Sequence, residues 1–141
     1  MTPLEPALLD RLFAAADTVR GRAHAPYSRF SVGAALLTTA GTIHAGCNVE
    51  NAAYPQGACA EAGAISAMVA AGETAIRAVA IVGGPVGAAG PLVTPCGGCR
   101  QRLREFATAD TQVFGRDEAG RVHAFTFAEL LPHAFGPEVL P

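Results

Sequence analysis

The chain has 141 residues and a formal net charge of −2; 50% of its residues are hydrophobic and only 16% are charged. This length predicts one domain over residues 1–141. The near-neutral charge and the absence of a basic run exclude a nucleic-acid partner held by electrostatics. The apolar content is more than a chain this small buries easily, so we expect a subunit interface.

The beginning of the chain has no pattern of a secretion signal, because Glu5 and Asp10 stand where such a signal carries a basic segment and an apolar run. The apolar stretch 75–86 contains Arg77 and is too short to span a bilayer. Four cysteines in such a chain favour metal binding or catalysis over disulfides. We therefore expect a cytoplasmic protein without a membrane partner.

Hydrophobic periodicity and turn residues predict helices that alternate with strands along the chain. The last helix is predicted to start with a capping box, in which Thr126 caps and Glu129 bonds back. The predicted helices cover 6–24, 57–71, 98–107 and 126–131; the predicted strands cover 30–39, 42–49, 75–82, 112–114 and 122–125; and 83–91 is a predicted loop.

This alternation predicts an α/β fold, a three-layer α-β-α sandwich with a sheet of about five strands. The first two strands are separated only by Ala40-Gly41, so they should pair antiparallel and make the sheet mixed.

Three cysteines and one glutamate carry the chemistry of the sequence. Cys59-Ala60-Glu61 is followed later by Pro95-Cys96-Gly97-Gly98-Cys99. Three thiolates leave the fourth corner of a tetrahedral zinc ion free for water, as in catalytic sites. Glu61 lies two residues beyond Cys59, close enough to exchange protons with that water without binding the metal. Each cysteine group should lie where a loop enters a helix N-terminus, which favours negative charge.

The cysteines also allow other interpretations. Cys96 and Cys99 alone are also typical of a redox pair or of half of a structural zinc clip, but a redox motif explains neither Cys59 nor Glu61. Cys47 lies on the second predicted strand and is expected to be a small buried hydrophobic residue, not a ligand.

The cysteine pattern and four further runs resemble the short type of cytidine deaminase, which has three cysteine ligands. The resemblance covers nearly the whole chain, and the runs occur in the order of that family. The runs are 30–35, 46–54, 99–101 and 130–137.

The resemblance implies a function for particular residues. The family hydrolyses cytidine and 2′-deoxycytidine to the uridines with release of ammonia, in pyrimidine salvage. It implies that Cys59, Cys96 and Cys99 bind Zn²⁺ and that Glu61 is the proton shuttle. The implied nucleoside-binding residues are Phe30 in the pocket wall, Asn48 and Glu50 at the sugar, Ala60 and Thr94 through backbone groups, and Tyr54 and Phe135 across subunits.

The chain departs from this family where an arginine usually follows the catalytic glutamate. Ala62 stands there, so the negative charge of three thiolates lacks its usual neighbouring cation. Arg100 is the first candidate to compensate that charge, and Arg102 and the helix N-termini are alternatives. Gly63 weakens the helix and suggests a close approach to another element.

Two further function classes remain open from the sequence. One is a deaminase of a modified cytosine nucleoside such as blasticidin S, and the other is a zinc-stabilised binding or redox protein without turnover. The resemblance also implies a homotetramer whose active sites are completed by neighbouring subunits. The small-residue helix 57–71 is predicted to supply Ala64, Ala67, Met68 and Ala71 to that assembly.

Overall fold

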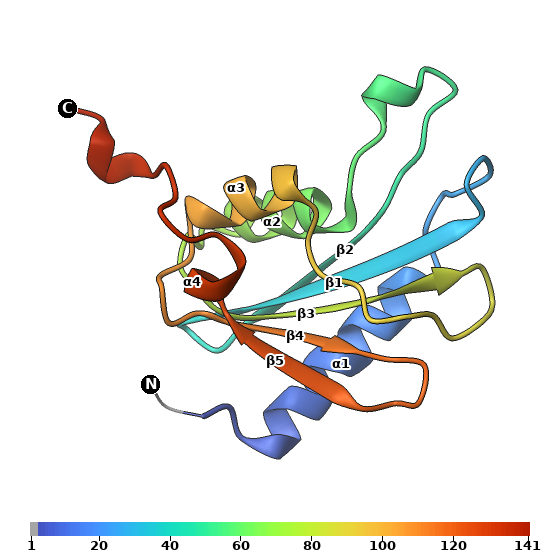
Figure 1. The fold of residues 1–141 in the computed structure, drawn as a ribbon, viewed down its shortest axis with the longest axis horizontal. Coiled ribbons are helices and arrows are strands. Elements are labelled where there is room, and N and C mark those ends of the chain that lie inside the picture. Colours follow the sequence, from blue (N-terminus) through green and yellow to red (C-terminus); the bar gives the residue numbers. More distant parts are fainter. Residues whose placement is uncertain (1–2) are drawn as a thin grey trace.

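The computed structural model describes residues 3–141 and shows a five-stranded mixed sheet between layers of helices (Figure 1). The strand order is β2-β1-β3-β4-β5. Only β3 and β4 are parallel, and the other three neighbouring pairs are antiparallel. The strands are β1 (Phe30–Thr38), β2 (Ile43–Cys47), β3 (Ile76–Pro85), β4 (Gln112–Arg116) and β5 (Val122–Thr126). The expected three-layer fold with a mixed sheet is confirmed.

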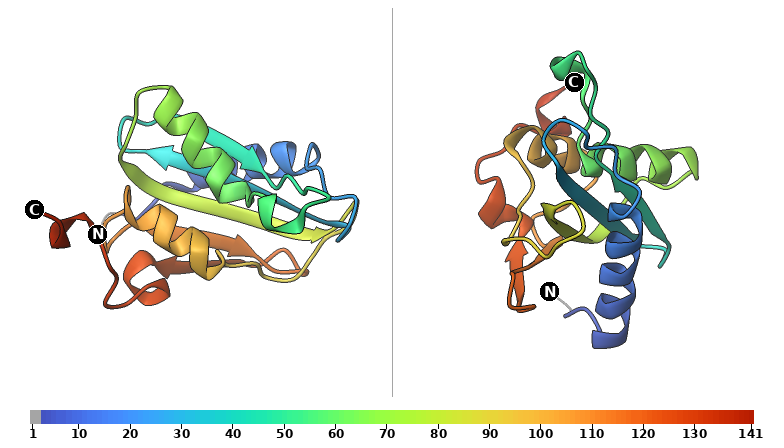
Figure 2. Two further views of the ribbon diagram at one scale, coloured as in Figure 1. Left: turned by 90° about the horizontal axis from the view of Figure 1, so that it is seen from above. Right: turned by 90° about the vertical axis from the view of Figure 1, so that its right-hand side faces the viewer.

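Four α-helices cover the sheet. Helix α1 lies on one face, while α2 and α3 lie side by side on the other (Figures 1 and 2). The capping box predicted for Thr126 and Glu129 is present at the start of α4. The helices are α1 (Pro6–Arg20), α2 (Ala60–Ala70), α3 (Gly97–Arg104) and α4 (Phe127–Leu130), and there are two 3-10 turns, η1 (Tyr54–Gln56) and η2 (Pro137–Val139). No helix within residues 3–141 is both long and apolar enough to cross a bilayer.

Strand alternation divides the apolar core into two parts. On β3, Ala78 and Ala80 pack toward α1, whereas Val79 and Ile81 pack toward α2, α3 and α4. All four side chains are buried. The central strand is therefore apolar on both faces, as its continuous apolar sequence predicts.

Several boundaries differ from those predicted. Helix α1 ends at Arg20 and not at 24, α3 ends at Arg104 and not at 107, and β4 continues to Arg116. The helix expected over 57–71 begins at Ala60, because η1 and a short extended segment precede it. Strand β3 extends into the first three residues of the expected loop 83–91 and ends at Pro85, since Gly83 and Gly84 pair with β1. Strand β2 ends at Cys47, so Asn48 and Glu50 lie beyond it.

Gly46 determines how closely α2 approaches β2. A Cβ atom on Gly46 would lie 2.2 Å from the backbone nitrogen of Ala64 and 2.6 Å from the carbonyl oxygen of Ala60. These are backbone atoms of α2 and cannot rotate away. Gly63 differs, because a Cβ there would meet its nearest atom at an ordinary 3.6 Å. Within the chain, the close approach of α2 to β2 therefore depends on Gly46, and a close approach of another helix at Gly63, as at a subunit interface, stays a prediction.

We expect Gly46→Ala to lower the free energy of unfolding by about 1–3 kcal/mol, the usual effect of overpacking a filled core. Gly63→Ala is the matched control and should not destabilise the chain, since alanine favours a helix by about 1 kcal/mol over glycine. Denaturant titration of both variants measures the difference. Equal stability of the two would contradict the role given to Gly46.

Candidate metal and catalytic site

The N-termini of α2 and α3 bring three cysteines together. Cys59 is the N-cap of α2, Cys96 is the N-cap of α3, and Cys99 lies in the first turn of α3. Their sulfur atoms all lie within 4.8 Å of one another, and the sulfurs of Cys59 and Cys96 are 3.9 Å apart. In the described part of the chain, this is the cysteine group that the structure assembles, and Cys47 is not part of it.

The spacing of the sulfurs fits a metal ion. Thiolates bound tetrahedrally to zinc at about 2.3 Å lie about 3.8 Å apart, close to the observed separation of Cys59 and Cys96. Burial raises the pKa of the Cys99 thiol, and the nearby Glu61 carboxylate raises it further. A hydrogen bond from the backbone of Cys99 instead lowers the pKa of Cys96. A divalent cation would therefore be needed to keep all three as thiolates.

Glu61 lies in the first turn of α2, next to the cysteines. Its side chain is buried, with the residue only 4% exposed, and it lines a cavity of about 370 Å³. Burial raises the pKa of this carboxyl group above its usual value. A carboxyl group that gains and loses a proton more nearly at neutral pH is suited to general acid–base catalysis.

The cavity contains most of the residues that the sequence indicated. It is formed by the segment after β2, the start of α2 and the segment before α3. Its lining includes Asn48, Glu50, Tyr54, Cys59, Ala60, Glu61, Thr94 and Cys96, together with Val32, Val49 and Val93. Reactive groups and apolar walls therefore share one open space.

Asn48 and Glu50 bind backbone of their own chain. The side-chain oxygen of Asn48 accepts from the N–H of Val32 at 2.8 Å, and its side-chain nitrogen donates to the carbonyl of Phe30 at 2.9 Å. The Asn48 amide is thus fixed against the start of β1. Since β2 ends at Cys47, these bonds orient this side chain.

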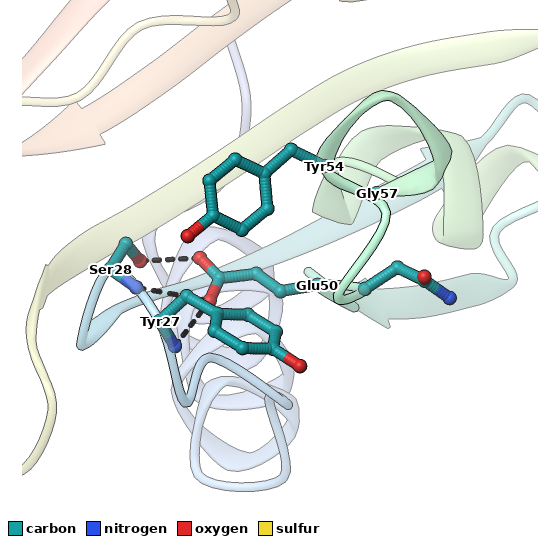
Figure 3. Close-up of a pocket in the computed structure, with 6 residues that line it drawn as sticks. Tyr27, Ser28, Glu50, Tyr54 and Gly57 are labelled. Atoms are coloured by element: carbon teal, nitrogen blue, oxygen red, sulfur yellow. Dashed lines mark hydrogen bonds between the residues drawn. The ribbon is translucent and has the colours of Figure 1, made fainter.

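The Glu50 carboxylate lines a second cavity of about 310 Å³ together with Tyr27 and Tyr54 (Figure 3). It accepts from the backbone N–H groups of Tyr27 and Ser28 and from the Ser28 hydroxyl. These hydrogen bonds lower the pKa of Glu50, and the bond from the Ser28 hydroxyl contributes most. The rings of Tyr27 and Tyr54 are 5.6 Å apart between centroids. Glu50, Tyr54 and Gly57 line both cavities, so the two are neighbours.

Sequence reasoning missed Tyr27 and Ser28, which precede the run 30–35 used for the resemblance. Their contacts with Glu50 join segments more than 20 residues apart and follow no local periodicity. The Pro26-Tyr27-Ser28 turn after α1 is the only local signal of a structured loop at this position.

Four indicated residues lie outside the cavity lining. One is Cys99, which is fully buried. Phe30 is half-buried at the start of β1, where a Cβ on Gly83 would lie 3.3 Å from its ring. Phe135 is 58% exposed, in the segment after α4 that projects from the molecule (Figure 1). Arg100 hydrogen-bonds three oxygen atoms, of Thr94, Pro95 and Leu130.

The fold and these residues define an α/β domain with a cysteine metal-site geometry and a buried carboxyl group beside it. The family model for the "cytidine and deoxycytidylate deaminase zinc-binding region" matches residues 7–115. The chain belongs to this family.

Individual relatives agree with that result. The chain is 41% identical to a cytidine deaminase of Sporosarcina psychrophila over 132 residues, which cover 94% of each protein. The solved structure of cytidine deaminase from Burkholderia pseudomallei has a TM-score of 0.80 at 40% identity, covering 89% of this chain and 98% of that one. The Mycobacterium tuberculosis cytidine deaminase structure has a TM-score of 0.76 at 37% identity, covering 91% and 97%.

Proposed function

We propose that this chain hydrolyses cytidine and 2′-deoxycytidine to the corresponding uridines and ammonia. The observation that carries the proposal is the buried Glu61 carboxyl group, placed beside three clustered thiols in an open cavity. Relatives with up to 41% identity, named cytidine deaminases, support this choice of substrate. They do not favour the alternative of a modified cytosine nucleoside such as blasticidin S.

Cys59, Cys96 and Cys99 would hold one zinc ion, which the family's zinc-binding region and the sulfur spacing support. A zinc ion bound there would activate a water molecule at neutral pH. Glu61 would take one proton from that water and deliver it to N3 of the base, while the water oxygen forms a bond to C4. Glu61 would then carry the remaining proton of that oxygen to the exocyclic amine, so that the C4–N bond breaks and ammonia leaves.

The remaining cavity groups would bind the nucleoside. Asn48 keeps one free lone pair on its oxygen and one free N–H, because each atom uses only part of its capacity within the chain. Glu50 is held in place by Tyr27 and Ser28 and is ionised, so it would accept a hydrogen bond from a sugar hydroxyl group. The backbone N–H of Ala60 would bind O2 of the base, the carbonyl of Thr94 would accept from the amine, and Phe30 would complete the wall.

The family model includes deaminases of deoxycytidylate, which is a nucleotide. The residues around the sugar therefore determine whether a nucleoside or a nucleotide is the substrate. Among the described residues that line the two cavities, none is Lys, Arg or His. A phosphate group would instead meet the Glu50 carboxylate, and like charges repel. These groups favour a nucleoside without a 5′-phosphate.

The assay that tests this function follows the loss of the cytidine absorbance band together with the zinc content. Cytidine, deoxycytidine, deoxycytidylate and free cytosine should be compared. We expect turnover of the two nucleosides and little of the nucleotide. A zinc-loaded protein that leaves every substrate unchanged would indicate a binding module, and preferred turnover of deoxycytidylate would overturn the nucleoside assignment.

We also propose a cytoplasmic homotetramer with shared active sites, formed by the single domain 1–141. Tyr54 and Phe135 are 74% and 58% exposed, and Val69 on α2 is exposed as well, so apolar surface is available for a neighbouring copy. Ala67 and Ala71 are exposed as well. Ala64 and Met68, which the sequence also placed in the assembly, are fully buried in the core of their own chain. They are therefore removed from that surface.

Phe135→Ala is expected to lower kcat/KM for cytidine by roughly tenfold and to leave the zinc content unchanged, because aromatic stacking contributes about 0.5–1.5 kcal/mol beyond area burial. Phe135→Tyr keeps the ring and is the matched control. Steady-state kinetics with metal analysis measures both variants. A near-normal Phe135→Ala enzyme would remove this ring from the site.

A mixing experiment tests whether that ring acts in a neighbouring subunit. A Glu61→Gln subunit and a subunit truncated before Phe135 should each be inactive. Mixed oligomers can contain one site with an intact Glu61 and a neighbour's Phe135, so activity should return. A fully active monomer in light scattering would overturn the assembly.

A further inference from the structure

The segment between β3 and α3 carries two site residues but little regular structure. Residues 89–96 form no helix or strand, although Thr94 lines the cavity and Cys96 supplies a thiol. Within residues 3–141, no backbone–backbone hydrogen bond is made by residues 91–95. Side-chain contacts must therefore hold this segment in place.

Arg100 makes these contacts from the second turn of α3. Its Nε donates to the carbonyl of Pro95 at 2.8 Å, and its Nη2 donates to the hydroxyl of Thr94 at 3.1 Å. Its Nη1 donates to the carbonyl of Leu130, the last residue of α4, at 2.6 Å. The side chain of Pro95 itself is fully buried. The half-buried guanidinium group of Arg100 on α3 thus connects the segment before Cys96 with the end of α4.

We propose that Arg100 is a positioning residue that fixes Thr94 and Pro95 so that the Thr94 carbonyl faces the substrate. All hydrogen-bond partners of the Arg100 guanidinium among the described residues are oxygens, none of them a cysteine sulfur. This inference rests on the proposed function. It assigns Arg100 the role of positioning Thr94 and Pro95, in place of the expected compensation of the thiolate charge.

Lysine separates geometry from charge at this position. Its ammonium group retains the positive charge but is a compact donor that cannot reach three acceptors in the planar arrangement of a guanidinium group. If the charge of Arg100 compensates the thiolates, Arg100→Lys should work and Arg100→Gln should fail. If Arg100 acts by position, both should fail.

We expect Arg100→Lys to lower kcat/KM by about tenfold to a hundredfold, the effect of a small displacement of a substrate-binding group. The loss should lie in kcat, with zinc content retained. Arg102→Lys is the control, since Arg102 is exposed on the same helix. Full activity of Arg100→Lys would overturn the proposal in favour of charge compensation.

A second pair of variants keeps the test decisive if Arg100→Lys fails to fold. Thr94→Val removes only the hydroxyl acceptor, whereas Thr94→Ser retains it. We expect Thr94→Val to be slower than Thr94→Ser, and Arg100→Lys to cost less when added to Thr94→Val than in the wild type, because one of its three contacts is already lost. Equal rates for the two Thr94 variants would overturn the proposal. Failure of the proposed function is distinguished by a wild-type protein that does not deaminate cytidine.

Discussion

Glu61→Gln is expected to lower kcat at least about 10²-fold while the fold and the zinc content remain intact. General acid–base catalysis typically contributes 10²–10⁴-fold, and an amide can neither take a proton from water nor deliver one to the base. The substitution is nearly isosteric, so the cavity beside the cysteines should keep its shape. Steady-state kinetics, metal analysis and thermal unfolding on one preparation separate these effects.

Glu105→Gln supplies the control for that experiment. Glu105 is exposed at the end of α3 and lies outside the cavity lining, so its neutralisation should leave kcat unchanged. Near-normal turnover of Glu61→Gln would remove Glu61 from the mechanism.

Cys96→Ala is expected to lose metal and activity together. The three sulfurs surround one position, and two remaining thiols hold a cation far less tightly than three. The pKa of the Cys59 and Cys99 thiols is raised by burial, so without the cation these groups return to the neutral form. Metal content after dialysis, measured with residual deaminase activity, tests this expectation.

Cys47→Ala is the matched control, because Cys47 is half-buried next to α2 and outside the sulfur cluster. It should retain metal and activity. A Cys47→Ala protein without zinc, or a Cys96→Ala protein that keeps zinc, would show that the ligand set is wrong.

Local patterns predicted most of the fold. The apolar runs of β1 and β3 and the Thr126–Glu129 capping box each depend on residues close in sequence, and each was found in the structure. The end of β2 was missed, because Asn48 satisfies backbone groups of β1 that an ordinary strand residue would satisfy with its own backbone.

The candidate site was predicted less evenly. The cysteines and Glu61 come together because each group lies at a helix N-terminus, which the sequence indicates. The Tyr27 and Ser28 contacts to Glu50 depend on how two distant loops meet, and no local pattern encodes that meeting. The Arg100 side chain likewise points toward the carbonyl groups of Pro95 and Leu130, to which it donates hydrogen bonds, and no local pattern predicts that direction.

The position of the cysteines on two separate helices also matters for folding. Cys59 and Cys96 are 37 positions apart in the sequence, and the segment between them includes the whole of β3. A metal ion bound to both closes this segment into a loop, and a cross-link of that kind lowers the conformational entropy of the unfolded chain. An ion bound by these cysteines would therefore also cross-link the helical layer formed by α2 and α3. On the opposite face of the sheet, α1 has its own apolar contacts and would gain nothing directly from the ion.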